Sequence, residues 1–222
     1  MLIQHNIGWA TYLSGRPQEA IDKHLLPVLQ SDWAKSITDD SREDELHVLM
    51  VAHDNAASAY GVLKNFTAML PHIREALRIC ELLARRLPAN VFYRDFATQY
   101  RAWYGYALAG TGQVGVGLAA IKETREAMDA RAKLEPPNQA SRRNQMIIAA
   151  VQALAFARWS GDASASFAER RERLARAEAS LADAEELDRS VRAKSGVLPV
   201  ARVELPAART KLEADERAKA KP

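Results

Sequence analysis

The chain has 222 residues and a net charge of +3, from 31 basic and 28 acidic side chains, and so small a surplus disfavours a nucleic-acid-binding protein. Hydrophobic residues make up 48% of the chain, whereas Gly (10) and Pro (9) are few, which favours close-packed helices over sheet. One cysteine excludes an internal disulfide framework, and no apolar stretch approaches the roughly 18–20 residues of a membrane span. We therefore expect a helical, cytoplasmic protein with no membrane or nucleic-acid partner.

A turn recurs at a nearly fixed interval along the chain. Its anchors are Gly15, Lys64, Gly112 and Gly161, which are spaced 49, 48 and 49 residues apart. Self-similarity at such a period is typical of repeat proteins, in which stacked supersecondary units share one core. Each anchor lies between two stretches in which apolar residues follow a helical spacing, so we expect a series of helix pairs.

The first unit covers residues 1–30. Its first helix is expected to extend to about Leu13, and its second to begin at Pro17, because proline favours the first turn of a helix. The polar stretch Ser31–Asp44 that follows is predicted to be a loop that caps the next helix.

The second unit covers residues 42–88 and holds the clearest helical pattern. After its turn, apolar residues alternate steps of four and three along about six turns of helix, at Phe66, Leu70, Ile73, Leu77, Cys80, Ala84 and Leu87. Pro88 cannot continue a helix and is expected to end this one. Cys80 lies on the apolar stripe, so we interpret it as a buried thiol and not as a nucleophile.

The third and fourth units cover residues 91–136 and 139–188 and follow the same plan. We expect residues 1–194 to form one repeat domain. Residues 195–222 are expected to form a C-terminal capping helix with a frayed tail.

One stretch of the third unit matches a nucleotide-binding fingerprint. Gly110, Gly112 and Gly115 form a literal G-x-G-x-x-G, a loop that can cradle phosphates at a helix N-terminus. The fingerprint requires a preceding strand, but residues 100–109 have an Ala- and aromatic-rich helical pattern. We therefore interpret these glycines as an inter-helix turn.

The units resemble the tetratricopeptide repeat family, which stacks antiparallel helix pairs into a right-handed superhelix. The first unit carries the pattern best, with Gly8 in the first helix, Gly15 at the turn and Ala20 where the helices cross. The period of 48–49 residues exceeds the roughly 34 of the standard repeat, so longer helices or connections are implied. The resemblance implies an all-α superhelix of about four antiparallel helix pairs plus a C-terminal capping helix.

A narrower resemblance covers about Ser41–Pro206. Runs such as Leu87-Pro88-Ala89-Asn90 are similar to the long-period repeat regions that follow many bacterial serine/threonine kinase domains. The chain itself has no H-R-D catalytic loop and no V-A-I-K strand, so it is not a kinase. This likeness implies the interaction region of a larger bacterial signalling protein.

In the tetratricopeptide family, the first helix of each pair lines a groove that takes up a peptide or a partner helix. Carried over position by position, this implies a groove formed by His5, Trp9, Tyr12, Asp54, Ser58, Gln99, Tyr106, Arg158 and Trp159. Aromatic residues and arginine often anchor interfaces. The expected function is therefore non-catalytic binding of a protein or peptide, with no catalytic residue, no cofactor and no metal.

Two alternatives stay open. The first is a sensor for a small peptide or metabolite. The second is a metal-dependent phosphohydrolase of the HD type, which the adjacent pair His53-Asp54 suggests. Metal ligation needs several such groups at one point. His47 and His53 lie six residues apart, about 240° around a helix, so these two cannot share a face.

Overall fold

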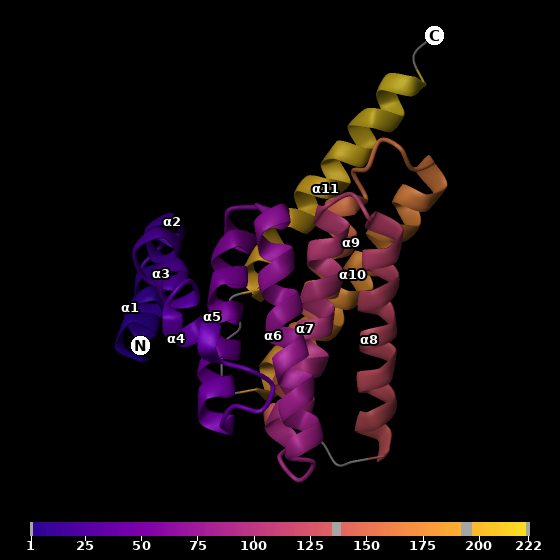
Figure 1. Ribbon diagram of the computed structural model, residues 1–222. Helices are drawn as coiled ribbons and strands as arrows, with labels where there is room; N and C mark the ends of the chain where they lie inside the picture. Colours follow the sequence, from indigo (N-terminus) through magenta and orange to yellow (C-terminus); the bar gives the residue numbers. More distant parts are fainter. Residues whose placement is uncertain (1, 135–138, 192–196, 221–222) are drawn as a thin grey trace. The chain divides into compact units, whose positions relative to one another are not determined.

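The computed structural model describes residues 2–134, 139–191 and 197–220, except for the side chains of residues 2, 3 and 5. Every regular element in these ranges is a helix (Figure 1), which confirms the expected all-α class for the described part of the chain. The chain divides into two compact units, Met1–Gln113 and Val114–Pro222. These two parts, and not the four sequence repeats, are the first and second units of the structure. This division falls next to the turn at Gly112. The predicted boundary between residues 194 and 195 lies outside the described residues and stays a prediction. The right-handed superhelix concerns the whole chain and stays a prediction.

The first unit begins with a helix pair whose second member is irregular. Its elements are α1 (Leu2–Leu13), α2 (Pro17–Ala20), the π-helical turn η1 (Ile21–Leu25) and α3 (Leu26–Leu29). Pro27 accounts for the irregularity, because it has no N–H to donate and its ring would clash with the Lys23 carbonyl in an α-helix. In the wider π turn, the Leu26 N–H donates to the Ile21 carbonyl instead.

A short helix follows where the sequence analysis predicted only loop. α4 (Asp32–Ser36) is capped by Ser31, whose hydroxyl accepts a hydrogen bond from the Ala34 N–H at 3.2 Å. The cap satisfies one of the free N–H groups of the first turn. The loop prediction for Ser31–Asp44 was therefore wrong for these five residues.

Three long helices complete the first unit: α5 (Glu43–Val62), α6 (Phe66–Arg86) and α7 (Val91–Gly110). α6 packs along both α5 and α7. Of the predicted apolar stripe of α6, Ile73 and Cys80 are buried and the other five residues are partly exposed. The buried face of the helix lies slightly to one side of that stripe and also includes Met69, Ala76, Ile79 and Leu83. α6 ends at Arg86, two residues before Pro88, as expected.

Small residues allow the first helix pair to pack closely on itself and on α5. A Cβ atom at Gly8 would lie only 2.8 Å from Cδ2 of Leu25. Ala20, at the expected crossing position, has no exposed surface and shares a core cluster with Ala56 and Ala59 of α5. The tetratricopeptide resemblance implied close packing at Ile7, Gly8 and Ala20. Gly8 and Ala20 do pack closely, whereas Ile7 is 42% exposed.

The second unit contains α8 (Val114–Leu134), α9 (Gln139–Trp159), α10 (Phe167–Ser190) and α11 (Val197–Lys219). α9 packs against α8, α10 and α11, and almost all of residues 146–157 are buried. Their many alanines permit contact on several sides of this helix. α11 also packs on α10.

The recurring turn has a common backbone conformation in its first three instances. The φ angles are +81° at Gly15, +56° at Lys64 and +94° at Gly112, all in the left-handed region that favours glycine. Within the described residues, Lys64 is the one non-glycine with positive φ. Gly161, the anchor of the fourth sequence repeat, does not share this conformation.

The glycines of the G-x-G-x-x-G match serve the turn between α7 and α8. Gly110 is the last residue of helix α7, so a helix and not a strand precedes the loop. A Cβ atom at Gly110 would lie 2.0 Å from Cγ of Phe66, which means that the ring packs directly on the backbone. The interpretation as an inter-helix turn is confirmed.

Candidate binding site around Asp54

The predicted groove residues are divided between the two units. His5 lies in α1, but its side chain is outside the described residues. The first unit holds the described side chains Trp9, Tyr12, Asp54, Ser58, Gln99 and Tyr106, and the second holds Arg158 and Trp159. The site is therefore built first from the residues of the first unit.

α1 carries an apolar strip that remains exposed in its own unit. Trp9 is 39% exposed and Leu13 is 64% exposed. The Trp9 ring stacks on Tyr12 with 5.0 Å between ring centroids. These three residues share one side of α1, because side chains three and four positions apart lie on the same face of a helix. The strip offers two large apolar side chains to a ligand.

Asp54 lies on α5 and carries an uncompensated charge. Its side chain is only partly exposed, and burial raises the pKa of its carboxyl group to about 6. No positively charged group of the described residues lowers this pKa; the interaction that does so comes from the Tyr100 hydroxyl. Ser58, one helical turn further along α5, lies on the same side of that helix and is also partly exposed.

Tyr100 places a second polar group beside this carboxyl group. The residue belongs to α7 and has no exposed surface. Its hydroxyl group makes no hydrogen bond of normal geometry, although it is close enough to Asp54 to interact with it. Burial is the main cause that raises the pKa of Tyr100, and the Asp54 charge is the second. The same two causes, in the same order, raise the pKa of Tyr12. Tyr12 of α1 and Tyr100 of α7 therefore both lie within electrostatic range of the Asp54 carboxyl group of α5.

The other two predicted residues of α7 differ in their surroundings. Gln99 is partly exposed, and its Oε1 atom is buried without a hydrogen-bond partner. Tyr106 is 2% exposed, and its ring meets Phe66 edge-on with 5.3 Å between centroids. Gln99 therefore has an unused hydrogen-bond acceptor inside the protein, whereas Tyr106 packs in the interior.

Cys80 approaches the site from α6 but is chemically quiet. Its Sγ–H donates a hydrogen bond to the Tyr93 carbonyl at 3.2 Å. Burial, followed by the Asp54 charge, raises the pKa of the thiol to about 12. Since the thiolate is the nucleophile, this cysteine stays protonated and unreactive at neutral pH, as the sequence analysis expected from its buried position.

His53 faces away from Asp54 and interacts with α6. Its Nδ1 atom lies 3.0 Å from Nδ1 of His72, so one ring donates and the other accepts. Burial, and then the neighbouring His72, lower the pKa of His53 to about 4. His47 contacts the Tyr93 hydroxyl instead, at 3.3 Å, which confirms that it shares no face with His53.

His53 and Asp54 are adjacent in the sequence, but their side chains have different neighbours: His72 of α6 for His53, and Tyr100 of α7 for Asp54. Throughout the described ranges, no three His, Cys, Asp or Glu side chains converge in a way that could hold a metal ion. An HD-type centre needs such a convergence, so the geometry lends that alternative no support.

In the second unit, the predicted binding residues contact other parts of that unit. The Arg158 guanidinium of α9 donates a hydrogen bond to Glu204 of α11 at 2.6 Å, in an ion pair that is mostly shielded from solvent. Trp159 is partly buried, and its carbonyl accepts a hydrogen bond from Arg173 at 2.9 Å. The guanidinium group that Arg158 would offer to a ligand is therefore already paired with Glu204 of α11.

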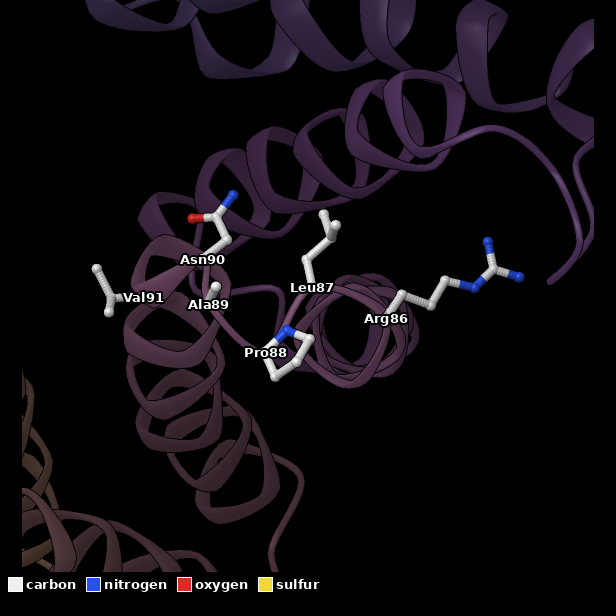
Figure 2. Close-up of a pocket in the computed structure, with 6 residues that line it drawn as sticks. All are labelled: Arg86, Leu87, Pro88, Ala89, Asn90 and Val91. Atoms are coloured by element: carbon white, nitrogen blue, oxygen red, sulfur yellow. The ribbon is translucent and has the colours of Figure 1, made fainter.

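A shallow hollow of about 540 Å³ lies at the turn between α6 and α7, lined by residues 86–91. Figure 2 shows that Arg86 extends away from the other lining residues. Its guanidinium donates to the Ser41 carbonyl at 3.1 Å, and Asn90 accepts from the Phe92 N–H at 3.1 Å to cap α7. Both polar side chains of the hollow thus serve the local fold. The surroundings of Asp54, with Tyr12 and Tyr100, are therefore the stronger candidate site.

Comparisons with protein families, with characterised proteins and with solved structures give no match to this chain. Within the described residues, no helix combines the length and the apolar character that crossing a membrane requires. The functional assignment therefore rests on the geometry of the site.

Proposed function

We propose that the chain is a non-catalytic scaffold that binds a protein or peptide segment on the side of the first unit formed by α1, α5 and α7. The observation that carries this proposal is the Asp54 carboxyl group of α5, whose pKa is raised to about 6 by burial and is lowered by no positively charged group of the described residues. Such a charge costs folding free energy. Groups that oppose folding are typical of functional sites, where a ligand supplies the missing interaction.

The exposed strip of α1 supports the same proposal. Trp9 and Leu13 remain 39% and 64% exposed, although each would be more stable if covered. Aromatic side chains are frequent anchors in interfaces, because they bury a large area at a small cost in conformational entropy. A peptide that lies along α1 and reaches Asp54 would use both features.

The finer prediction, a right-handed superhelix of tetratricopeptide type in a larger bacterial signalling protein, is part of this proposal. It is supported by the left-handed turns at Gly15, Lys64 and Gly112, because a recurrent turn geometry at a fixed period is what stacked helix pairs require. The proposal also includes a reducing, cytoplasmic location, which agrees with the free thiol of Cys80.

Selection of a displayed library of random peptides against the full chain tests the proposed function. We expect enriched peptides whose affinity falls about tenfold or more on Trp9→Ala or Leu13→Ala, the range expected for loss of an interface anchor. Val203→Ala is the matched control, since this residue of α11 is an aliphatic side chain with 73% exposure. The proposal is wrong if no peptide is enriched, or if the enriched peptides bind both α1 variants as well as they bind the wild type.

A further inference from the structure

We propose that the ligand of the first unit is a peptide with a basic side chain, lysine or arginine, whose cationic group binds the Asp54 carboxylate between Tyr12 and Tyr100. This inference rests on the proposed function and deepens it, because it assigns a chemical class to the ligand. Its first support is the hydrogen-bonding capacity of Asp54. An ionised carboxylate only accepts hydrogen bonds and has about four acceptor positions, of which the Tyr100 O–H can fill one.

The second support is the buried hydroxyl group at the base of the site. Tyr100 has no exposed surface and its hydroxyl lacks a partner of normal geometry, which is costly for a buried polar group. The hydroxyl group is close enough to Asp54 to interact with it, so it is the donor available to the ionised carboxylate at the base of the site. Asp54 as a residue is partly exposed, and the ligand would approach its carboxylate from this exposed side.

The third support is the aromatic pair on α1. The Tyr12 ring lies near enough to Asp54 to interact with its charge, and the Trp9 ring stacks on Tyr12. Lysine and arginine carry long apolar stems that pack on aromatic rings, and their cationic groups are attracted to ring faces. A basic side chain therefore fits both the rings and the carboxylate.

A metal ion fits this site less well than an organic cation. Hard metal ions take several oxygen ligands, but the described residues bring no cluster of three potential ligands together here. A guanidinium or ammonium group needs only one carboxylate and makes charge-assisted hydrogen bonds with it.

The ionisable groups around Asp54 keep their charge state between pH 5 and 7, so a change in binding over this range reports the charge of Asp54. They are Tyr12 of α1, Cys80 of α6 and Tyr100 of α7, and burial raises the pKa of all three. These side chains stay neutral between pH 5 and 7, because their ordinary pKa values are already roughly 8.5–10. His53, the neighbour on α5, is also neutral there, since its pKa is lowered to about 4. Asp54 is the group of this set whose charge changes.

The test measures binding of the full chain to short peptide mixtures, acetylated and amidated so that their ends carry no charge. The mixtures are uncharged apart from the central residue, which is Lys, Arg, norleucine or Glu. At about pH 7 we expect the Lys and Arg mixtures to bind about tenfold more tightly than the norleucine mixture, as one charge-assisted hydrogen bond suggests. Asp54→Asn should abolish the difference, and in the wild type it should shrink as the pH is lowered to about 5.

The other outcomes each overturn the inference in a distinguishable way. Equal binding of all mixtures, or preference for Glu, contradicts the cation site; if Trp9→Ala still weakens that binding, the proposed function survives. Absence of binding by every mixture contradicts both proposals. Spermidine is the final probe: Asp54-dependent binding of spermidine, without a preference for Lys over norleucine in the mixtures, assigns the site to a small cation and not to a peptide.

Discussion

Asp54→Asn should make the protein more stable at neutral pH while it removes the charge of the proposed site. Burial raises the pKa of this carboxyl group from 3.8 to about 6. At about 1.4 kcal/mol per pH unit, the ionised form therefore costs about 3 kcal/mol of folding free energy at pH 7. The amide keeps the size and shape of the side chain and removes this cost, so we expect the free energy of unfolding to rise by about that amount.

The sign of the effect also fixes its pH dependence. Since the pKa of Asp54 is higher in the folded chain than in the unfolded chain, its contribution to stability is complete below pH 3.8 and is lost as the pH rises through about 6. The advantage of Asp54→Asn should therefore be largest near pH 7 and vanish near pH 4.

Urea denaturation followed by tryptophan fluorescence measures this effect in the relevant unit, because Trp9, Trp33 and Trp103 lie in the first unit and Trp159 in the second. Asp44→Asn is the control: this exposed residue forms an ion pair with Arg42 that lowers its pKa, so its replacement should bring no gain. A stability of Asp54→Asn equal to or below that of the wild type would refute the reasoning, because the carboxylate would then have a compensating partner.

Three further predictions concern the turns and the histidine pair. Lys64→Gly should raise the free energy of unfolding by about 0.5–1 kcal/mol, because it relieves a left-handed conformation (φ +56°) that is unfavourable for a side chain; unchanged or lower stability in urea would contradict this. Gly110→Ala should lower it by about 1–3 kcal/mol, since the added Cβ would lie 2.0 Å from Phe66. The loss should shrink in a Phe66→Ala background, and an equal loss in both backgrounds would contradict the contact. In the Asp54→Asn background, stability should fall by about 3 kcal/mol between pH 6.5 and about 4, because the pKa of His53 is lowered to about 4 in the folded chain. A stability of Asp54→Asn that stays constant over this range would contradict the lowered pKa of His53. In the wild type, protonation of Asp54 offsets part of the fall, so identical pH profiles for the two proteins would contradict the raised pKa of Asp54.

Local chemistry made most of the helices predictable from sequence. The apolar stripe of α6 and the proline after it define that helix without reference to the rest of the chain, and α6 ends at Arg86 as expected. The recurring turn was recognisable at Lys64 as well, because the period carried the pattern where glycine was missing. α4 was missed, since its polar sequence has no apolar period and one serine cap defines its start.

The site was only partly predictable, because it depends on contacts between distant residues. Asp54 was named as a groove residue through the family resemblance, but nothing in the sequence analysis linked it to Tyr100, 46 residues later. Its ring does lie in the interior, and only the packing of α7 brings its hydroxyl group near the carboxylate. Leu13 was not singled out, since a leucine at a helix end is ordinary in sequence and its 64% exposure follows from tertiary packing. The Arg158–Glu204 ion pair was hidden for the same reason.

The most direct test of the Asp54 site is a ¹³C NMR titration of its carboxyl carbon, in the free protein and with the Lys-centred peptide mixture at saturation. In the free protein the midpoint should lie at about pH 6. Pairing with a cation favours the ionised form, so the bound midpoint should fall toward the ordinary value of about 4. A midpoint near 4 in the free protein, or one that the peptide mixture leaves unchanged at about 6, would contradict the proposal that this carboxylate awaits a cationic ligand.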